Sequence, residues 1–299
     1  MDALTITNLT KKFGDKTVLD KLNLSVPKHS IFGFVGKNGA GKTTTMKTVL
    51  GLLKPDEGRI TVAGERVVYG QTKTNRHIGY LPDVPEFYSY MTPYEYLAFC
   101  GKISEIPAKD LKSRCCGLLE LVGLKNEKHR IKGFSRGMKQ RLGIAQALLN
   151  RPKLLICDEP TSALDPVGRK EILDILLLAK EQTTILFSTH ILSDVERICT
   201  DAAFLDKGTI VLQGSVSGMR NLNSSKKYVL ELADRKDTEK IMQAFTGLTL
   251  NQNHELVFRE ESGLLFSILH FIAEQKIPVQ KLEHMEIPLE DLFLEVTKP

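Results

Sequence analysis

Features that would assign the chain to a membrane or secreted class are missing from the sequence. No apolar stretch approaches the ~18 residues of a membrane-spanning helix, and the short run Ile172–Ala179 contains Asp174. The first residues, Met1–Thr5, lack the basic start and the apolar run of a secretion signal. These absences predict a cytosolic chain.

Cysteine is too sparse and too irregularly spaced to form a disulfide framework or a metal site. The five cysteines are an odd number, and their spacing contains neither a CxxC pair nor a Cys/His metal pattern. Because Cys115 and Cys116 are adjacent, they cannot easily bridge each other. We therefore expect reduced thiols, most of them packed in the interior, at Cys100, Cys115, Cys116, Cys157 and Cys199.

The composition that is present is that of an ordinary globular protein. The 299 residues predict two domains, and the 42% hydrophobic and 26% charged fractions exclude disordered, collagen-like and coiled-coil classes. The 41 Lys and Arg exceed the 36 Asp and Glu and give a net charge of +5. This mild excess suits a polyanionic ligand, but the basic residues are spread along the chain and do not require nucleic acid.

The first part of the chain alternates between strand-like and helix-like segments. Apolar patterning predicts a hairpin over Gly58–Val68 and strands at Ala3–Asn8, Thr17–Leu24, Ile31–Val35, Lys153–Cys157 and Thr183–Ser188. Helices are expected at Thr43–Leu53, from about Thr92 to Gly123, and at Gly137–Asn150, Val167–Gln182 and Ser193–Cys199. This alternation indicates an α/β fold with a mostly parallel core sheet covered on both faces.

A polar break at Asn221–Lys227 precedes a second, smaller pattern. Beyond it, strands are expected at Tyr228–Leu232, Leu256–Phe258 and Val279–Glu283, and helices at about Thr238–Phe245 and Leu264–Glu274. The sequence therefore predicts a large domain over residues 1–220 and a small α+β domain over residues 221–299. The small domain is interpreted either as a packing or dimerising appendage or as a regulatory domain.

A glycine-rich loop follows the apolar strand that ends at Val35. Residues Gly36–Thr43 read GKNGAGKT and fit the pattern GxxxxGK[ST] without a departure. The glycines let successive backbone N–H groups turn inward around phosphates, and the helix that opens at Lys42 adds the positive end of its dipole. In this pattern Lys42 reaches the β- and γ-phosphates, and the Thr43 hydroxyl ligates Mg²⁺. The alternative is a chance glycine turn, which the preceding strand and the following helix disfavour.

Two acidic residues end the strand expected at Lys153–Cys157. Asp158 and Glu159 come at the carboxyl end of a strand, where α/β sheets bind ligands. Asp158 is placed to hold the Mg²⁺ shell, and Glu159 is then free to polarise a water aimed at the γ-phosphate. Alone, such a pair is equally a strand end that meets solvent. The glycine loop upstream favours the functional interpretation.

Three further motifs lie on either side of the acidic pair, the first before it and the other two after it. Residues Ser135–Arg141 read SRGMKQR and open a helix, Ser162–Asp165 read SALD, and Ser188–His190 read STH at the end of the next strand. Together with the glycine loop and the acids, these motifs resemble the nucleotide-binding subunit of ATP-binding cassette (ABC) transporters over roughly residues 1–215. The resemblance implies a P-loop NTPase cassette with an N-terminal antiparallel β subdomain, a helical signature subdomain at about 88–150, and ATP and Mg²⁺ as cofactors.

The resemblance also implies roles for individual residues. Phe13 stands where the family has an aromatic residue that stacks on adenine, although a buried core phenylalanine is the alternative. Ser135 and Gly137 resemble the signature loop, which binds the γ-phosphate held by the opposite subunit. Asp165 resembles the acid that crosses the dimer interface, and His190 resembles the switch histidine that helps to orient the attacking water.

Two positions depart from the family pattern. The signature carries Arg136 and Met138 where the commonest form has Gly and Gln, and Arg136 either adds charge toward the partner's nucleotide or is solvated. Asp83 replaces the usual glutamine of the Q-loop; a carboxylate can ligate Mg²⁺, but it brings negative charge near the γ-phosphate. The residues expected to contact ATP, its Mg²⁺ ion or the reacting water are Phe13, Gly36, Lys37, Asn38, Gly39, Ala40, Gly41, Lys42, Thr43, Thr44, Asp83, Ser135, Gly137, Asp158, Glu159, Asp165 and His190.

Aromatic residues gather just after the Q-loop position. They are Phe87, Tyr88, Tyr90, Tyr94, Tyr96 and Phe99. Some of them belong to the core, and an exposed remainder would suit a partner interface. In ABC transporters this region receives a coupling helix of the membrane subunit, so the resemblance implies that Phe87–Phe99 contacts a transmembrane permease.

The leading hypothesis is a transport motor on the inner face of the cell membrane. Two ATPase subunits, identical or homologous, would close on two ATP molecules, and hydrolysis would release them, while a separate permease carries the substrate. The segment Phe134–Arg141 and the ending Pro288–Leu294 resemble ABC-2-type export ATPases, including those linked to antibiotic or drug efflux. An importer ATPase is the alternative within the class.

Two functions outside transport compete with this hypothesis. A soluble ABC ATPase could act on nucleic acid or ribosomes, but the chain has no basic run, and the spacing from Lys42 to Ser135 is too short for a long coiled coil. We therefore expect no nucleic-acid partner. A nucleotide-binding regulator that no longer hydrolyses ATP is the other alternative; Glu159 argues against it, and Asp83 keeps it open.

Overall fold

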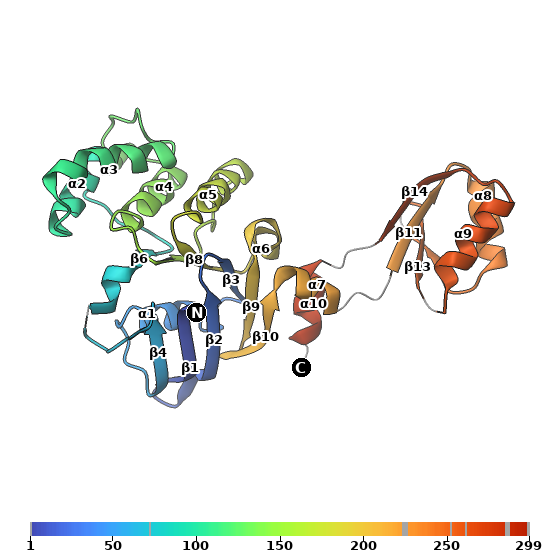
Figure 1. Cartoon of the computed structure of the whole chain (residues 1–299), viewed down its shortest axis with the longest axis horizontal. Helices are drawn as coiled ribbons and strands as arrows, with labels where there is room; N and C mark the ends of the chain where they lie inside the picture. The colour runs from blue at the N-terminus through green and yellow to red at the C-terminus, as the bar shows by residue number, and fades with distance from the viewer. Residues whose placement is uncertain are drawn as a thin grey trace. The chain divides into compact units, whose positions relative to one another are not determined.

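The chain divides into two compact units. The computed structural model describes residues 2–71, 73–222, 227–251, 253–260, 262–284 and 288–297. One unit comprises residues 1–216 with 296–299, and the other comprises residues 217–295 (Figure 1). The sequence placed this boundary at residue 221, and residues 223–226 of the expected polar break lie outside the described residues.

Strands and helices alternate through the first unit. Its strands are β1 (Asp2–Phe13), β2 (Lys16–Pro27), β3 (Ile31–Gly36), β4 (Glu57–Val62), β5 (Glu65–Arg66), β6 (Ile78–Leu81), β7 (Leu154–Asp158), β8 (Thr184–Thr189), β9 (Asp201–Asp206) and β10 (Thr209–Ser215). Its helices are α1 (Lys42–Val49), α2 (Pro93–Ile103), α3 (Ala108–Leu121), α4 (Arg136–Ala147), α5 (Pro166–Ala179) and α6 (Leu192–Ile198), and α7 (Val216–Leu222) begins at its boundary. Within the described part of the chain, no helix is both long and apolar enough to cross a membrane.

A six-stranded sheet forms the centre of the first unit, in the order β10-β9-β3-β8-β7-β6. Only the β9–β10 pair is antiparallel, so the predicted mostly parallel α/β sheet is confirmed. Every residue of β3, β7 and β8 is buried, as expected for strands covered on both faces. Because strand side chains alternate, Phe32 and Phe34 face the core shared with α1, whereas Gly33 packs against Val195 of α6.

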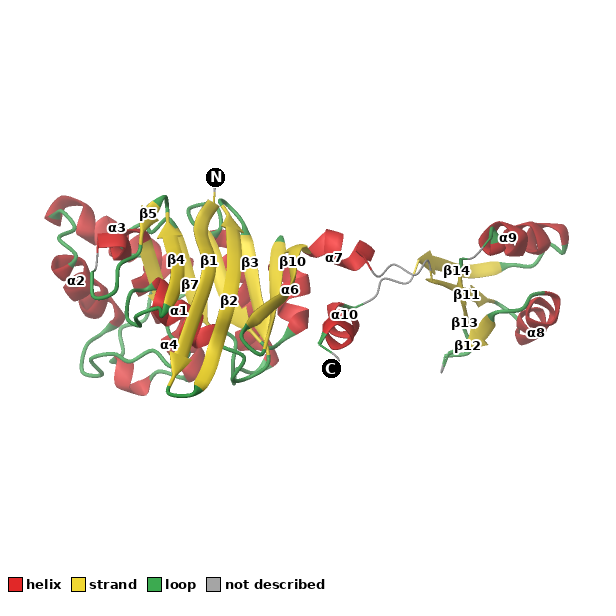
Figure 2. Ribbon diagram, turned by 90° about the horizontal axis from the view of Figure 1, so that it is seen from below, coloured by secondary structure: helices red, strands yellow, loops and turns green. Residues whose placement is uncertain are grey.

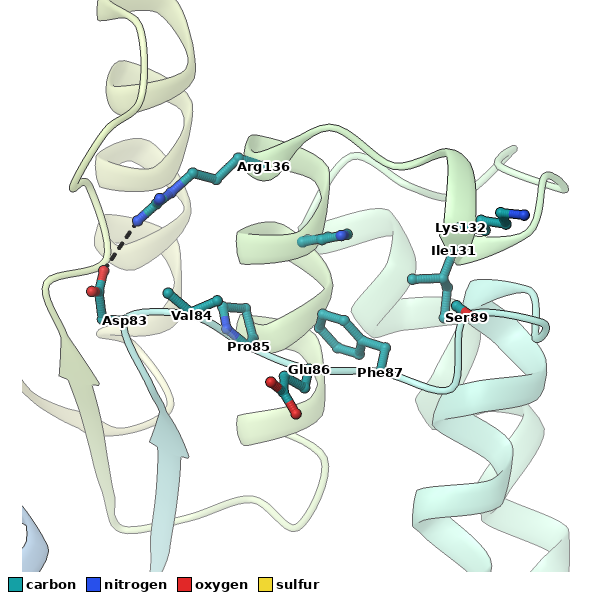
Figure 3. Close-up of a pocket in the computed structure, with 10 residues that line it drawn as sticks. Asp83, Val84, Pro85, Glu86, Phe87, Ser89, Ile131, Lys132 and Arg136 are labelled. Carbon is teal, nitrogen blue, oxygen red and sulfur yellow. Dashed lines mark hydrogen bonds and ion pairs between the residues drawn. The ribbon is translucent and has the colours of Figure 1, made fainter.

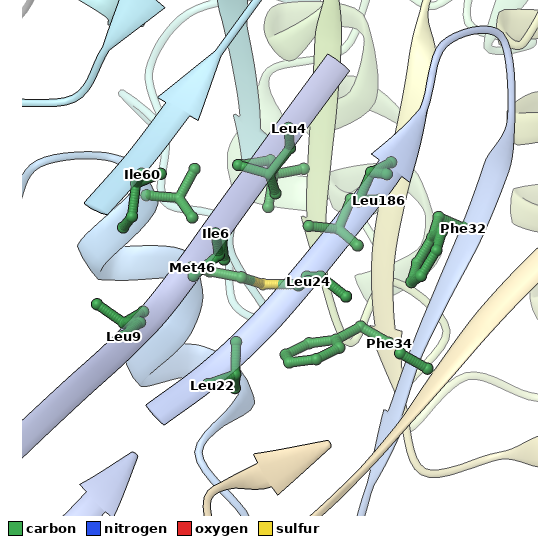
Figure 4. Close-up of a cluster of buried hydrophobic side chains, with 14 of the residues drawn as sticks. Leu4, Ile6, Leu9, Leu22, Leu24, Phe32, Phe34, Met46, Ile60 and Leu186 are labelled. Carbon is green, nitrogen blue, oxygen red and sulfur yellow. The ribbon is translucent and has the colours of Figure 1, made fainter. Parts of the chain in front are cut away.

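A second, antiparallel sheet, β2-β1-β4-β5, packs against the first through one apolar core. The core is built from alternate residues of β1 and β2, from Phe32 and Phe34 of β3, and from Met46 of α1 (Figure 4). Leu4, Leu22 and Met46 are buried in this core, so the second turn of α1 packs against both sheets. The loop between β3 and α1 is therefore anchored on a rigid platform.

Helices α2, α3 and α4 form the segment between β6 and β7. The helical region predicted from about Thr92 to Gly123 is confirmed, and it consists of two helices: α2 ends at Ile103 and α3 begins at Ala108. Pro107 lacks an N–H and disfavours the helical conformation of the preceding residue, which separates the two helices. The start of α2 was predicted correctly, because Thr92 and Glu95 cap each other and Pro93 occupies the first turn.

The second unit contains an antiparallel sheet with α8 and α9 on one side (Figure 2). Its elements are β11 (Lys227–Leu232), α8 (Arg235–Ala244), β12 (Leu248–Leu250), β13 (Leu256–Arg259), α9 (Leu264–Glu274), β14 (Val279–His284) and α10 (Leu289–Val296). The order from β11 to β14 is βαββαβ and the sheet order is β12-β13-β11-β14, which is the arrangement of a split βαβ, ferredoxin-like fold. The three residues of β12 were too few for the sequence to indicate a strand.

The five cysteines are free thiols, as predicted, although they are not all packed in the interior. Cys115 and Cys157 are buried, Cys116 is exposed, and Cys100 and Cys199 lie between these extremes. Burial raises the pKa of the Cys157 thiol, so this cysteine, one residue before Asp158, stays protonated and inert.

Candidate nucleotide-binding site

The glycine-rich loop joins β3 to α1, so the predicted strand, loop and helix are present. Two of its glycines are required by close contacts. Gly41 has a φ of 115° at the start of α1, and a Cβ there would lie 2.7 Å from Leu19 Cδ2. A Cβ on Gly36 would lie 2.7 Å from the carbonyl oxygen of Leu205. Glycine thus lets the backbone turn tightly at the amino end of a helix, which is a natural anion-binding position.

Lys42, the first residue of α1, lies beneath this loop. Its Nζ donates hydrogen bonds to the carbonyl oxygens of Gly36 at 2.6 Å and Lys37 at 3.3 Å, and it lies 3.1 Å from Glu159 Oε1. The Lys42 side chain is 6% exposed and that of Glu159 is 14% exposed. A nearly buried cation is therefore held at the centre of the loop with a carboxylate as its counter-ion.

Asp158 is buried at the end of β7 between two hydroxyl groups. Thr43 Oγ1 donates to its Oδ2 at 2.9 Å, and Ser188 Oγ donates to its Oδ1 at 2.7 Å. The parallel register of β7 and β8 pairs Asp158 with Ser188, which explains why these residues meet. Burial and the nearby charge of Asp158 raise the pKa of Tyr80 to about 12, so this phenol adds no charge.

Glu159 lies between Lys42 and His190. Its Oε2 is 2.8 Å from His190 Nδ1, and its backbone N–H donates to Ser188 Oγ at 3.0 Å. Glu159 has a φ of 49°, a left-handed conformation that is costly for a residue with a side chain and is typical of functional sites. Sequence reasoning missed Ser188, and the available signal was its position opposite Asp158 on the next strand.

These residues line a pocket of about 350 Å³. Its walls are Val18, Asn38, Gly39, Gly41, Lys42, Thr43, Thr44, Asp83, Asp158 and Glu159. Three carboxylates and one ammonium group leave the pocket negative, so a triphosphate would need an added cation. Among the described residues no three His, Cys, Asp or Glu side chains converge on a metal position. Mg²⁺ fits this donor set, because it binds through one or two protein oxygens and the substrate's phosphates.

Asp83 follows β6 and borders the pocket, but its carboxylate is engaged elsewhere. Ser162 Oγ donates to its Oδ1 at 2.5 Å. Arg136 Nη2 lies 3.1 Å from the same oxygen, and Figure 3 marks this ion pair with a dashed line. Gln140 Nε2 donates to the Asp83 carbonyl oxygen at 2.6 Å. The expectation that Arg136 is merely solvated therefore holds only in part. Its side chain is about half exposed, but it also forms an ion pair with Asp83.

Besides His190 and the loop residues Gly36, Lys37 and Ala40, four predicted nucleotide contacts do not line this pocket. Ser135 caps α4 by accepting a hydrogen bond from Met138 N at 3.2 Å, and the position where Gly137 would carry a Cβ meets only Leu164, at 3.9 Å. Asp165 caps α5 by accepting from Gly168 N at 3.1 Å. Phe13 is the fourth, so contacts of these residues with nucleotide stay predictions.

The Phe13 side chain lies at the end of β1 and is 49% exposed. The alternative of a buried core phenylalanine is therefore wrong. Lys11 Nζ lies 5.1 Å from the ring centroid, within range of a cation–π contact. An exposed ring of this kind is free to stack on a planar ligand.

The aromatic cluster is partly core and partly surface. Tyr96 is buried and packs edge-to-face against Phe87, with ring centroids 5.0 Å apart. Tyr88, Tyr90, Tyr94 and Phe99 are each more than a third exposed. Beside this cluster lies a larger pocket of about 600 Å³, whose walls include Phe87, Glu86, Lys132 and Lys139 (Figure 3).

Comparison with known proteins places the chain in a family. Residues 19–162 match the family model of ABC transporters. The uncharacterised ABC transporter ATP-binding protein YxlF of Bacillus subtilis is 35% identical over 296 residues, which cover 98% of this chain and 99% of that protein. The bacitracin transport ATP-binding protein BcrA of Bacillus licheniformis is 37% identical over 297 residues, with 97% and 95% coverage. The chain therefore belongs to the ATP-binding proteins of ABC transporters.

A solved structure described as the ATP-binding subunit of an ABC transporter has the same fold. Its TM-score is 0.67 at 31% identity, and the match covers 74% of this chain and 92% of that one. The fold expected from the glycine loop, the acids and the signature is therefore confirmed. The chain is an ABC ATPase, a family that binds ATP and couples its hydrolysis to transport.

Proposed function

We propose that the 350 Å³ pocket binds and hydrolyses ATP through the residues that the sequence singled out. The backbone of Gly36–Thr44 and the Nζ of Lys42 would hold the phosphates, since both are anchored at the start of α1. Thr43 and Asp158 would hold Mg²⁺, with the Asp83 carboxylate as a further oxygen donor at the pocket's edge. The bound ion would neutralise charge on the β- and γ-phosphates.

The observation that best supports this proposal is that Glu159 contacts both Lys42 and His190. A carboxylate within 3.1 Å of the phosphate-binding lysine and 2.8 Å of a histidine can accept a proton from water beside the γ-phosphate. When Lys42 turns to the phosphate, Glu159 loses its counter-ion and is free for that water. His190 would then contact both Glu159 and the γ-phosphate and keep the two groups in position.

Complete sites would form between two ATPase subunits, identical or homologous. Ser135 and Gly137 lie at the amino end of α4, and Asp165 lies at the amino end of α5, where they would approach the nucleotide of the partner. Phe13 would stack on the adenine of its own subunit. Ser135, Gly137 and Asp165 do not line the pocket of the single chain, which agrees with their contacting the nucleotide of the partner.

We further propose that the transporter is an exporter and that its permease contacts the aromatic segment. BcrA and this chain align over nearly their full lengths, and BcrA is a bacitracin transport ATP-binding protein. Phe87 lines a 600 Å³ pocket that could receive a helix of a membrane subunit on the inner face of the membrane, and Tyr88, Tyr90 and Phe99 of the same segment present exposed rings. An adjacent gene for a six-helix membrane protein would support export, and one for a solute-binding protein would favour import.

The decisive variant for the site is Glu159→Gln. ATP binding should persist, while turnover should fall at least about 100-fold, because the general base is removed. Equilibrium binding of labelled ATP and the steady-state release of phosphate measure the two properties. Glu181→Gln, a matched change at an exposed glutamate, should leave both unchanged. Unchanged turnover in Glu159→Gln would refute the assignment of Glu159 as the base.

A further inference from the structure

The two departures from the family pattern meet in space. Asp83 comes from the loop after β6 and Arg136 is the first residue of α4, yet Arg136 Nη2 lies 3.1 Å from Asp83 Oδ1. Ser162, in the loop between β7 and α5, completes the group: its hydroxyl accepts from Arg136 Nη2 at 2.9 Å and donates to Asp83 Oδ1 at 2.5 Å. Figure 3 shows the Arg136 side chain reaching across to Asp83.

Asp83 borders both pockets of the site. It lines the 350 Å³ pocket with Lys42 and the 600 Å³ pocket with Arg136. A glutamine at this position would be neutral, whereas an ionised carboxylate would repel a triphosphate in the first pocket. Arg136 carries the opposite charge and lies against the same carboxylate, so the Asp83–Arg136 pair is neutral as a whole.

We propose that Arg136 is a positioning residue that makes Asp83 compatible with ATP. It neutralises the carboxylate and, with Ser162, holds Oδ1 in place through a hydrogen bond and an ion pair. The two departures are therefore one compensated change, in which each residue is tolerated because of the other. This inference rests on the proposed ATP site, and it assigns Arg136 no direct contact with nucleotide.

The pair can be altered without unfolding the protein. The Arg136 and Asp83 side chains are 42% and 48% exposed, and exposed ion pairs contribute little to folding. Arg136→Met keeps the apolar stem and removes the charge, and Asp83→Asn keeps the shape and removes the charge. The cap of α4 is unaffected, because it depends on Ser135.

The test is a double-mutant cycle on ATP affinity in the full-length protein. A fluorescent ATP analogue is titrated into the wild type, Arg136→Met, Asp83→Asn and the double variant, with EDTA and again with Mg²⁺. Arg136→Met should weaken affinity about three- to fivefold in EDTA, the range of a partly screened charge pair. In the Asp83→Asn background the same substitution should have no effect, since no carboxylate remains to be compensated. Arg136→Lys should retain most of the wild-type affinity.

Two controls make the cycle decisive. Lys139→Met removes a cation that lines the same 600 Å³ pocket but forms no ion pair with Asp83 among the described contacts, and it should leave affinity unchanged. Equal losses from Arg136→Met in both backgrounds, or an equal loss from Lys139→Met, would overturn the compensation. Lys42→Ala should abolish binding in every background. Binding that survives Lys42→Ala would instead refute the proposed ATP site.

Discussion

The two units of the chain bury different kinds of side chain. The first unit encloses an ammonium group and two carboxylates, on Lys42, Asp158 and Asp194, besides its apolar core. Among the described residues of the second unit, Thr238 is the only polar side chain that is buried. Burying a charge is costly unless it is paired, so a fold retains such groups where they act or where they connect elements. Among the described residues, buried charge is therefore a feature of the first unit, and the buried interior of the second is apolar apart from Thr238.

The largest expected effect is a loss of stability confined to the second unit. Phe258 is 2% exposed and stacks on Tyr228 with ring centroids 5.8 Å apart, so Phe258→Ala should lower the free energy of unfolding of this unit by about 3–5 kcal/mol. Calorimetry would show its transition moving while ATP affinity stays constant. Phe266→Ala is the matched control, since Phe266 is 74% exposed on α9. A parallel loss of ATP affinity would show that the two units unfold together.

A smaller effect on the free energy of unfolding is expected when a buried carboxylate outside the nucleotide pocket is removed. Asp194 is 1% exposed and accepts hydrogen bonds from Arg169 Nε at 2.6 Å and Thr161 Oγ1 at 2.8 Å. Asp194→Ala should lower the free energy of unfolding of the first unit by about 2 kcal/mol, because both donors lose their acceptor. Asp174→Ala, which removes a half-exposed ion pair with Arg197, should cost less than about 1 kcal/mol. Equal unfolding free energies for the two variants would contradict this distinction.

The smallest expected effect concerns the residue that sequence reasoning missed. Ser188→Ala removes the hydroxyl that orients Asp158 Oδ1 and receives the Glu159 backbone N–H. We expect kcat to fall about tenfold, equal to about 1.4 kcal/mol, with little change in the KM for ATP. Stopped-assay kinetics would measure both. Ser193 accepts a hydrogen bond from Arg169 and does not line the pocket, so Ser193→Ala should leave kcat unchanged. An equal fall in kcat for Ser193→Ala would contradict a specific role of Ser188 in the site.

Local patterns predicted most of the first unit correctly. The glycine loop, the strand before it and the helix after it depend on neighbouring residues, so their spacing was readable. The helical region from about Thr92 to Gly123 was also predicted, although no boundary was assigned before Pro107, where α2 and α3 separate. Strand β12 was missed because three residues carry too little periodicity.

The sequence by itself determined the chemistry that this protein carries: a phosphate loop with Lys42, an acidic pair after an apolar strand, and a histidine after the next. Only the tertiary structure decided which of these groups touch. It paired Glu159 with Lys42 and His190, placed Ser188 on Asp158 through strand register, and joined Arg136 to Asp83 across three segments. The physical reason is that residue type fixes what a side chain can donate or accept, whereas distance between remote residues depends on how sheets and helices pack.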